Sequence, residues 1–136
     1  TWLGQLPYSE ALQQYSWADV FVFTSLRDTG GMVVPEALAA GLPVVCLDHQ
    51  GVHDIVTDEC GIKIPVTSVR EVVVHLCEAL VALAHDPSRR DTLGRAGLVR
   101  PLEYCWSERG RRIAAIYRQV LGDGFPWEPR DADNGE

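Results

Sequence analysis

The 136-residue sequence contains no hydrophobic run that approaches the roughly 18 residues of a membrane-spanning helix. It shows no recognisable signal peptide either, so we expect a cytoplasmic protein without a transmembrane segment. Basic side chains are scarce: Lys and Arg total 12 against 19 Asp and Glu, which gives a formal net charge of −7. No basic stripe with interleaved aromatic residues is present. This balance argues against nucleic acid as a partner.

The sequence also lacks the spacings that are typical of metal and redox sites. None of its four cysteines forms a Cys-x-x-Cys pair, which favours free thiols over disulfides or zinc. These cysteines are Cys46, Cys60, Cys77 and Cys105. His49 and His53 superficially suggest a metal pair, but Gly51 lies between them and the stretch is predicted to be a loop. We therefore expect no metal site.

What the sequence does contain is a strand end, a glycine loop, a short helix and a second strand within residues 24–45. Residues 19–23 and 43–48 are short apolar runs without clean alternation, as expected for parallel strands buried on both faces. The helix between them has one apolar face, made of Val33, Val34, Ala37, Leu38 and Gly41. Glu36 lies away from this face and can point toward a ligand. The fold class predicted is α/β with a Rossmann-like parallel sheet.

The chemistry of this segment suits a polar ligand that carries phosphates. Gly30 and Gly31 allow backbone amides to approach a ligand, and the start of the helix offers unpaired N–H groups. Asp28 and Glu36 can accept hydrogen bonds from the hydroxyls of a sugar or ribose. The simpler alternative is an ordinary strand–loop–helix connection, in which Glu36 is a first-turn acid favoured by the helix dipole.

The segment resembles the nucleotide-sugar site of retaining glycosyltransferases of the GT-B fold, family four. The family signature is two acids separated by seven residues, here Asp28 and Glu36, followed by a small-residue helix and Gly-x-Pro-Val, here within residues 37–45. Residues 3–10, 15–20, 50–56 and 60–62 are also similar to family segments, so the resemblance covers about residues 2–121. The chain departs from the family at three positions: Asp28 replaces a glutamate, Gly30 a phenylalanine and Gln50 a glycine.

The resemblance implies a role for each residue of the segment. Glu36 and Asp28 are the expected catalytic residues, since Glu36 would bind the ribose hydroxyls and Asp28 a hydroxyl of the donor sugar. The remaining donor-binding residues expected are Arg27, Thr29, Gly30, Gly31, Met32, Val33, Gln50 and Gly51. In this family the leaving phosphate is thought to act as the base, so the resemblance implies neither a protein nucleophile nor a metal cofactor.

The resemblance also sets the expected organisation and partners. Residues 1–121 correspond to the later part of a donor-binding domain, and residues 122–136 are predicted to be a disordered acidic tail. The implied partners are a UDP- or GDP-sugar donor and a glycan or lipid-linked acceptor, in polysaccharide biosynthesis. We expect such a fragment to be inactive by itself. The alternative is a non-catalytic module that binds nucleotides or self-associates through an exposed sheet edge.

Sequence signals also predict the later helices. Ser9, Ser68, Ser88 and Ser107 are the expected N-caps of helices that end near residues 15, 84, 100 and 121. Ser68 and Glu71 have the spacing of a capping box. Arginines cluster within residues 89–112. Solvated helix faces are the preferred interpretation of this cluster, and peripheral association with the inner membrane stays open.

Overall fold

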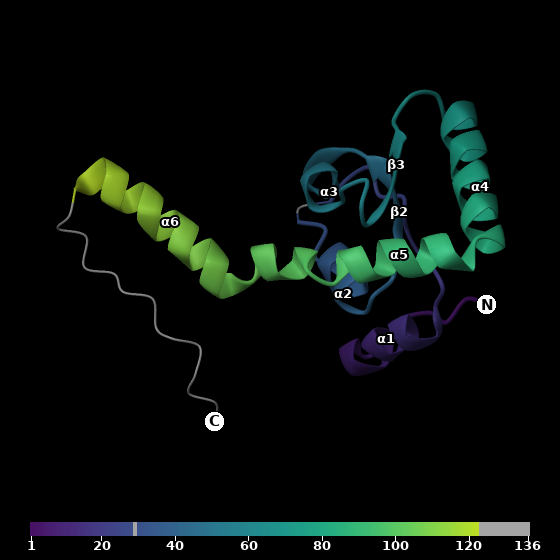
Figure 1. Ribbon diagram of the computed structural model, residues 1–136, viewed down its shortest axis with the longest axis horizontal. Coiled ribbons are helices and arrows are strands. Elements are labelled where there is room, and N and C mark those ends of the chain that lie inside the picture. The colour runs from purple at the N-terminus through teal and green to yellow at the C-terminus, as the bar shows by residue number, and fades with distance from the viewer. Residues whose placement is uncertain (29, 123–136) are drawn as a thin grey trace. The chain divides into compact units, whose positions relative to one another are not determined.

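The computed structural model describes residues 1–28 and 30–122. The chain divides into two compact units, of which the first ends at Pro101 and the second begins at Leu102. The first unit contains a three-stranded sheet and most of the helices (Figure 1). Its elements, in chain order, are α1 (Tyr8–Gln14), the 3₁₀ turn η1 (Tyr15–Trp17), β1 (Phe21–Phe23), α2 (Val33–Ala39), β2 (Val44–Asp48), α3 (Gln50–Ile55), β3 (Gly61–Pro65), α4 (Val69–His85) and α5 (Pro87–Gly97). A second 3₁₀ turn, η2 (Arg100–Tyr104), leads into α6 (Trp106–Leu121).

The sheet is parallel, with the strand order β1-β2-β3, and it confirms the predicted α/β class. Val44 of β2 lies opposite Phe21 of β1 and opposite Gly61 of β3. The central strand β2 is buried on both faces, as its unbroken apolar run predicted. The edge strand β1 is shorter than the predicted residues 19–23, and Val22 is 41% exposed. The expectation of burial on both faces is therefore wrong for β1.

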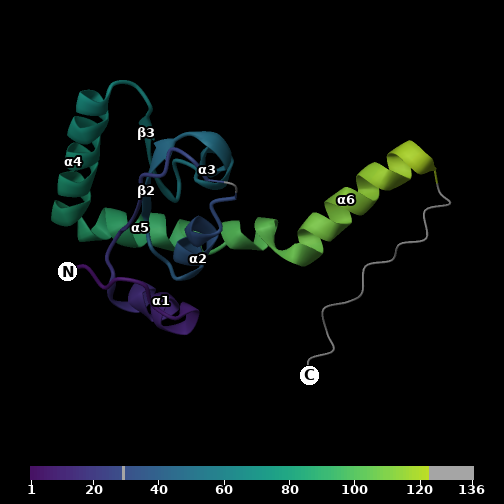
Figure 2. The ribbon, with the colours of Figure 1, turned by 180° about the vertical axis from the view of Figure 1, so that it is seen from behind.

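Helices cover both faces of the sheet. Figure 1, and the reverse view in Figure 2, show α2 and α3 on one side of β2 and β3, and α4 on the other. The core on the α4 side joins Val45, Leu47 and Ile64 of the sheet to Leu83 of α4 and Leu93 of α5. On the other side, α2 buries Val34, Ala37 and Leu38 completely. Each fully buried aliphatic side chain contributes about 1.5–3 kcal/mol to folding.

Helix α5 packs unusually close to the turn between α2 and β2. A Cβ atom on Gly94 would lie 2.2 Å from the carbonyl oxygen of Gly41, nearer than any real carbon atom approaches. A Cβ atom on Gly97 would lie 2.9 Å from Cδ2 of Leu38. The backbone of α5 therefore lies directly on this turn, because glycine places no side chain between them.

The helix ends agree with the predictions only in part. Ser68 and Glu71 form the predicted capping box, and α4 has the predicted extent. The other three predicted serine caps are wrong: the N-cap positions are Pro7 for α1, Asp86 for α5 and Cys105 for α6. Helix α5 begins with Pro87 because the side chain of Asp86 accepts from the Arg89 N–H, and it ends at Gly97 rather than near residue 100.

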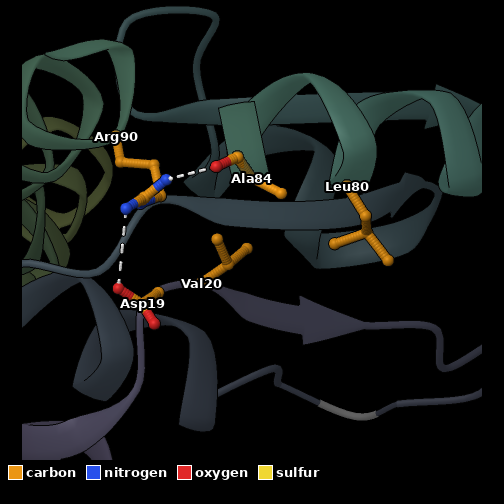
Figure 3. A pocket seen from close by; sticks show the side chains of 5 residues that line it. All are labelled: Asp19, Val20, Leu80, Ala84 and Arg90. Atoms are coloured by element: carbon orange, nitrogen blue, oxygen red, sulfur yellow. Dashed lines mark hydrogen bonds and ion pairs between the residues drawn. The ribbon is translucent and has the colours of Figure 1, made fainter. Parts of the chain in front are cut away.

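Arg90 ties the turn between α4 and α5 to the amino end of β1 (Figure 3). Its guanidinium donates to the carbonyl oxygens of Leu83, at 2.5 Å, and of Ala84, at 3.2 Å, and lies 3.7 Å from a carboxylate oxygen of Asp19. Asp19, Ala84 and Arg90 border a pocket of about 240 Å³ that Val20 and Leu80 also line. Arg90 thereby donates to two carbonyl groups at the end of α4, of which that of Leu83 also accepts from the Asp86 N–H at 3.4 Å.

The second unit contains α6, whose apolar stripe is exposed. The stripe consists of Ile113, Ile116, Tyr117 and Val120. Gly122 ends the helix with a φ of 80°, and residues 123–136 of the predicted acidic tail lie outside the described residues. Within the described part of the chain, the structure has no helix whose length and hydropathy would let it span a membrane.

Candidate functional site

The loop that follows β1 is held by the side chains of Asp28 and Gln50. The Asp28 N–H donates to Oε1 of Gln50 at 2.9 Å, which links this loop to the start of α3. Oδ1 of Asp28 accepts from the Gly30 N–H at 3.1 Å, a side-chain turn that aspartate commonly forms. Two loops from neighbouring parallel strands therefore meet at the carboxyl end of the sheet, where ligands bind in open α/β folds.

Gln50 adopts a backbone conformation that normally favours glycine. Its φ is 53°, and it begins α3, a stretch that the sequence analysis predicted to be a loop. That prediction is wrong because burial of Val52 and Ile55 outweighs the low helix propensity of Gly51. Strained backbone of this kind is often retained at functional sites. Here the strained residue also supplies the acceptor that holds Asp28.

Gly31 is packed into the same corner of the structure, where the loop after β1 meets the start of α3. Its φ is 54°, and a Cβ atom at this position would lie 3.1 Å from Cγ2 of Val52 and 3.8 Å from Oδ2 of Asp28. Gly31 is buried, and Gly30 beside it is exposed. Because the two glycines have no side chains, the loop can pass between the side chain of Asp28 and α3.

Glu36 lies in the first turn of α2 and is partly buried. Two tyrosine hydroxyls donate to its carboxylate: Tyr8 to Oε1 at 3.0 Å and Tyr15 to Oε2 at 3.4 Å. The hydrogen bond to Glu36 and its negative charge raise the pKa of Tyr8. Burial, reinforced by the charge of Glu36, raises the pKa of Tyr15 to about 12.

The sequence analysis missed both tyrosines. Tyr8 and Tyr15 precede Glu36 by 28 and 21 residues, and no helical or strand spacing connects positions so far apart. The only sequence signal was that both fall in segments similar to the family pattern.

The remaining predicted residues that the structure describes lie in the loop after β1 and at the starts of α2 and α3. Arg27, Met32 and Val33 are exposed, as is Gly51 of α3. Thr29 lies outside the described residues. An apolar pocket of about 230 Å³ adjoins the loop on the α4 side. It is lined by Thr24, Leu26, Leu47, Val66, Thr67, Val69, Val72 and Val73.

The two histidines near the site are arranged differently from a metal pair. Nδ1 of His53 lies 2.5 Å from Oδ1 of Asp48, and His49 precedes α3 in an extended conformation. Among the described residues, no three His, Cys, Asp or Glu side chains are grouped to hold a metal ion. All four cysteines are free. Burial raises the pKa of the Cys46 thiol to about 12.

Comparison with known proteins gives a consistent result. The sequence matches the family described as "Glycosyl transferases group 1" over residues 1–98. It is 34% identical over 110 residues to the sulfoquinovosyl transferase SQD2 of Arabidopsis thaliana, a match that covers 81% of this chain and 22% of that protein. It is 30% identical over 122 residues to a GDP-mannose-dependent phosphatidylinositol monomannoside mannosyltransferase of Corynebacterium glutamicum, covering 84% and 31%.

A solved structure supports the same relationship. The sucrose-phosphate synthase of Thermosynechococcus elongatus superposes with a TM-score of 0.70 and is 27% identical, over 89% of this chain and 30% of that one. The chain thus spans between about a fifth and a third of the length of these relatives. Its sheet and helices have the fold of a GT-B glycosyltransferase. The chain belongs to the glycosyl transferases group 1 family.

Proposed function

We propose that residues 1–101 bind the nucleoside diphosphate sugar donor of a retaining glycosyltransferase. The observation that carries this proposal is the corner at the carboxyl end of the sheet, where the hydrogen bond between Asp28 and Gln50 joins two loops. Glu36 lies in the helix that follows the first of these loops, with its carboxylate oriented by two tyrosines. Acids and glycines in this arrangement match the hydroxyls and phosphates of such a donor.

Each residue has a role that its place in the corner supports. Glu36 accepts from the ribose hydroxyls, and Asp28 accepts from a hydroxyl of the donor sugar. The backbone amides of Gly31 and Met32 face the diphosphate, and their dipoles stabilise the charge that grows there as the sugar leaves. The Gly30 N–H donates to Asp28 and orients that carboxylate toward the sugar. The resemblance to the family assigns Arg27, Thr29, Val33 and Gly51 to the same donor site.

The reaction breaks the bond between the anomeric carbon and the diphosphate oxygen. A bond from the same carbon to the acceptor oxygen forms on the same face of the sugar, and the acceptor proton passes to the leaving diphosphate. This chain supplies binding and orientation for that step. The phosphatidylinositol mannoside enzyme above and an O-antigen chain mannosyltransferase of Escherichia coli are both relatives, which supports a lipid-linked or glycan acceptor and a role in polysaccharide biosynthesis.

A second candidate function is a non-catalytic module that self-associates through the edge of the sheet. The observation in its favour is that β1 is an edge strand, which pairs only with β2 in the sheet that the structure describes. Sedimentation of the purified chain distinguishes the two, since edge pairing predicts dimers or larger species whose population rises with protein concentration.

The test of the donor site is calorimetric titration of the chain with UDP, GDP and their common sugar conjugates. Glu36→Ala is expected to abolish binding, and Glu78→Ala, which removes an exposed glutamate from α4, is the matched control. The donor site is supported if Glu36→Ala loses binding and Glu78→Ala retains it. The compound that binds then identifies the nucleobase of the donor. A folded, monodisperse wild-type chain that binds none of these compounds refutes it.

A further inference from the structure

The carboxylate of Glu36 has acceptor capacity beyond its two tyrosines. A carboxylate has two oxygens with about four acceptor positions. Tyr8 occupies one position on Oε1, and Tyr15 occupies one on Oε2. Each oxygen therefore keeps a position for another donor, and the two open positions lie on a group whose orientation is already fixed from two sides.

The tyrosine Tyr15 is anchored in the fold. Its ring meets Phe21 of β1 edge to face, with centroids 5.7 Å apart and planes at 76°. Aromatic pairs favour this geometry. The hydroxyl of Tyr15 consequently has a defined position with respect to the strand that leads into the Asp28 loop.

The other tyrosine, Tyr8, contributes little to folding. It is 67% exposed, and α1 contains no buried residue. Hydrogen bonds on an exposed surface add little to stability because water competes for both partners. The main consequence of the contact is thus for Glu36, whose flexible side chain would otherwise sample several rotamers.

We propose that Tyr8 and Tyr15 are positioning residues that orient Glu36 so that its open acceptor positions receive the paired 2′- and 3′-hydroxyls of a ribose. The inference rests on the proposed donor site and adds to it the two residues that set its preference for ribose. Orienting a group before the ligand arrives lowers the entropy that binding must supply. Both tyrosines keep their protons at neutral pH, because their pKa values lie above the ordinary value of 10.0. The hydrogen bond to Glu36 raises the pKa of Tyr8, and burial, reinforced by the charge of Glu36, raises that of Tyr15.

The test measures how strongly the full chain prefers ribose. GDP, UDP and their 2′,3′-dideoxy counterparts are titrated into the wild type, Tyr8→Phe and Tyr15→Phe, each confirmed as folded by circular dichroism. Phenylalanine keeps the ring and removes only the hydroxyl. Each variant is expected to bind the ribonucleotide about fivefold more weakly and to leave dideoxynucleotide affinity within about twofold of the wild type. Tyr117→Phe removes a hydroxyl from α6 and is the matched control. Its ratio of ribonucleotide affinity to dideoxynucleotide affinity is expected to equal that of the wild type.

The outcomes separate this inference from the proposed function. If the wild type binds GDP or UDP and both phenylalanine variants keep its ratio of ribose to dideoxyribose affinity, positioning is refuted while the donor site stands. Tighter ribonucleotide binding by Tyr8→Phe would show that Tyr8 competes with the ligand, which also overturns the inference. A wild type that binds neither nucleotide refutes the proposed function and this inference together.

A second measurement tests the contact without any nucleotide. Spectrophotometric titration follows the summed ionisation of the four tyrosines, which include Tyr8 and Tyr15. Glu36→Gln removes the charge that raises both, so it is expected to lower the two pKa values. An identical titration curve for the wild type and Glu36→Gln would show that the hydroxyls do not contact the carboxylate in solution, and the inference would fail on that ground alone.

Discussion

Substitution of the two adjacent glycines of the β1–α2 loop should have opposite effects on stability. Gly31 has a φ of 54°, a conformation that costs a residue with a side chain roughly 1–2 kcal/mol. Its new Cβ atom would lie 3.1 Å from Cγ2 of Val52, so the buried valine must also shift. We expect Gly31→Ala to lower the free energy of unfolding by about 2 kcal/mol.

Gly30→Ala is the matched control in the same loop. Its Cβ atom would lie 3.8 Å from Cγ of Met32, an ordinary van der Waals contact, and no positive φ is involved. The substitution removes freedom from the unfolded chain and should be neutral or stabilising by about 0.4–1 kcal/mol. The two variants should therefore differ by about 2–3 kcal/mol although their chemistry is identical.

The assay is urea unfolding followed by circular dichroism. With a slope of about 1–3 kcal/mol per molar, the midpoints of the two variants should differ by about 0.7–3 M. Equal midpoints would refute the reasoning, because they would mean that neither the left-handed backbone of Gly31 nor its contact with Val52 persists in solution. A more stable Gly31→Ala variant would refute it more strongly.

Three further predictions concern stability outside the loop. Ser68→Ala should cost about 1 kcal/mol in urea unfolding because the capping box of α4 is lost, whereas Ser107→Ala should change stability by less than about 0.5 kcal/mol; equal losses would contradict the assignment of the caps. Arg90→Ala should cost about 1–2 kcal/mol because the carbonyl groups of Leu83 and Ala84 lose the hydrogen bonds from its guanidinium, whereas Asp19→Ala should cost less than about 0.5 kcal/mol, since an exposed ion pair contributes little. The reverse order would show that the ion pair dominates. Burial raises the pKa of the Cys46 thiol from 9.0 to about 12 in the folded protein. The buried thiol therefore makes its full contribution to the free energy of unfolding below pH 9, and this contribution declines as the pH rises from 9 to 12. Unfolding free energies across this range should fall more steeply for the wild type than for Cys46→Ala, and parallel curves would contradict the assignment.

The sequence predicts the parts of the fold whose signals are local. The unbroken apolar run of β2 indicates a strand buried on both faces, and the capping box at Ser68 fixes the start of α4. Helix α3 was missed because it has only six residues, begins at a positive φ and contains a glycine, so its formation depends on the burial of Val52 and Ile55. Burial of that kind is a property of the assembled sheet and not of the local sequence.

The candidate site shows the same division. Asp28 and Glu36 were predicted by their spacing and by resemblance to a family, and the structure places both at the carboxyl end of the sheet. The contact of Asp28 with Gln50 spans 22 residues, and the tyrosines that hold Glu36 are just as remote in sequence. Such partners come together because the folded chain brings distant segments to the carboxyl end of the sheet. No rule based on residue spacing can predict them.

The glycine contact between α5 and the α2–β2 turn limits which substitutions this protein can accept during evolution. With Gly94 against the carbonyl of Gly41, the separation of the two segments is set by main-chain atoms alone. Most positions of a core can exchange one side chain for another of similar volume while a neighbour adjusts. Here there is no neighbouring side chain to adjust, so even one added methyl group would push the helix outward and open a path for water toward Leu38 and Leu93. Random mutagenesis with selection for folded protein should therefore recover almost no replacements at position 94, although the exposed positions of the same helix accept many.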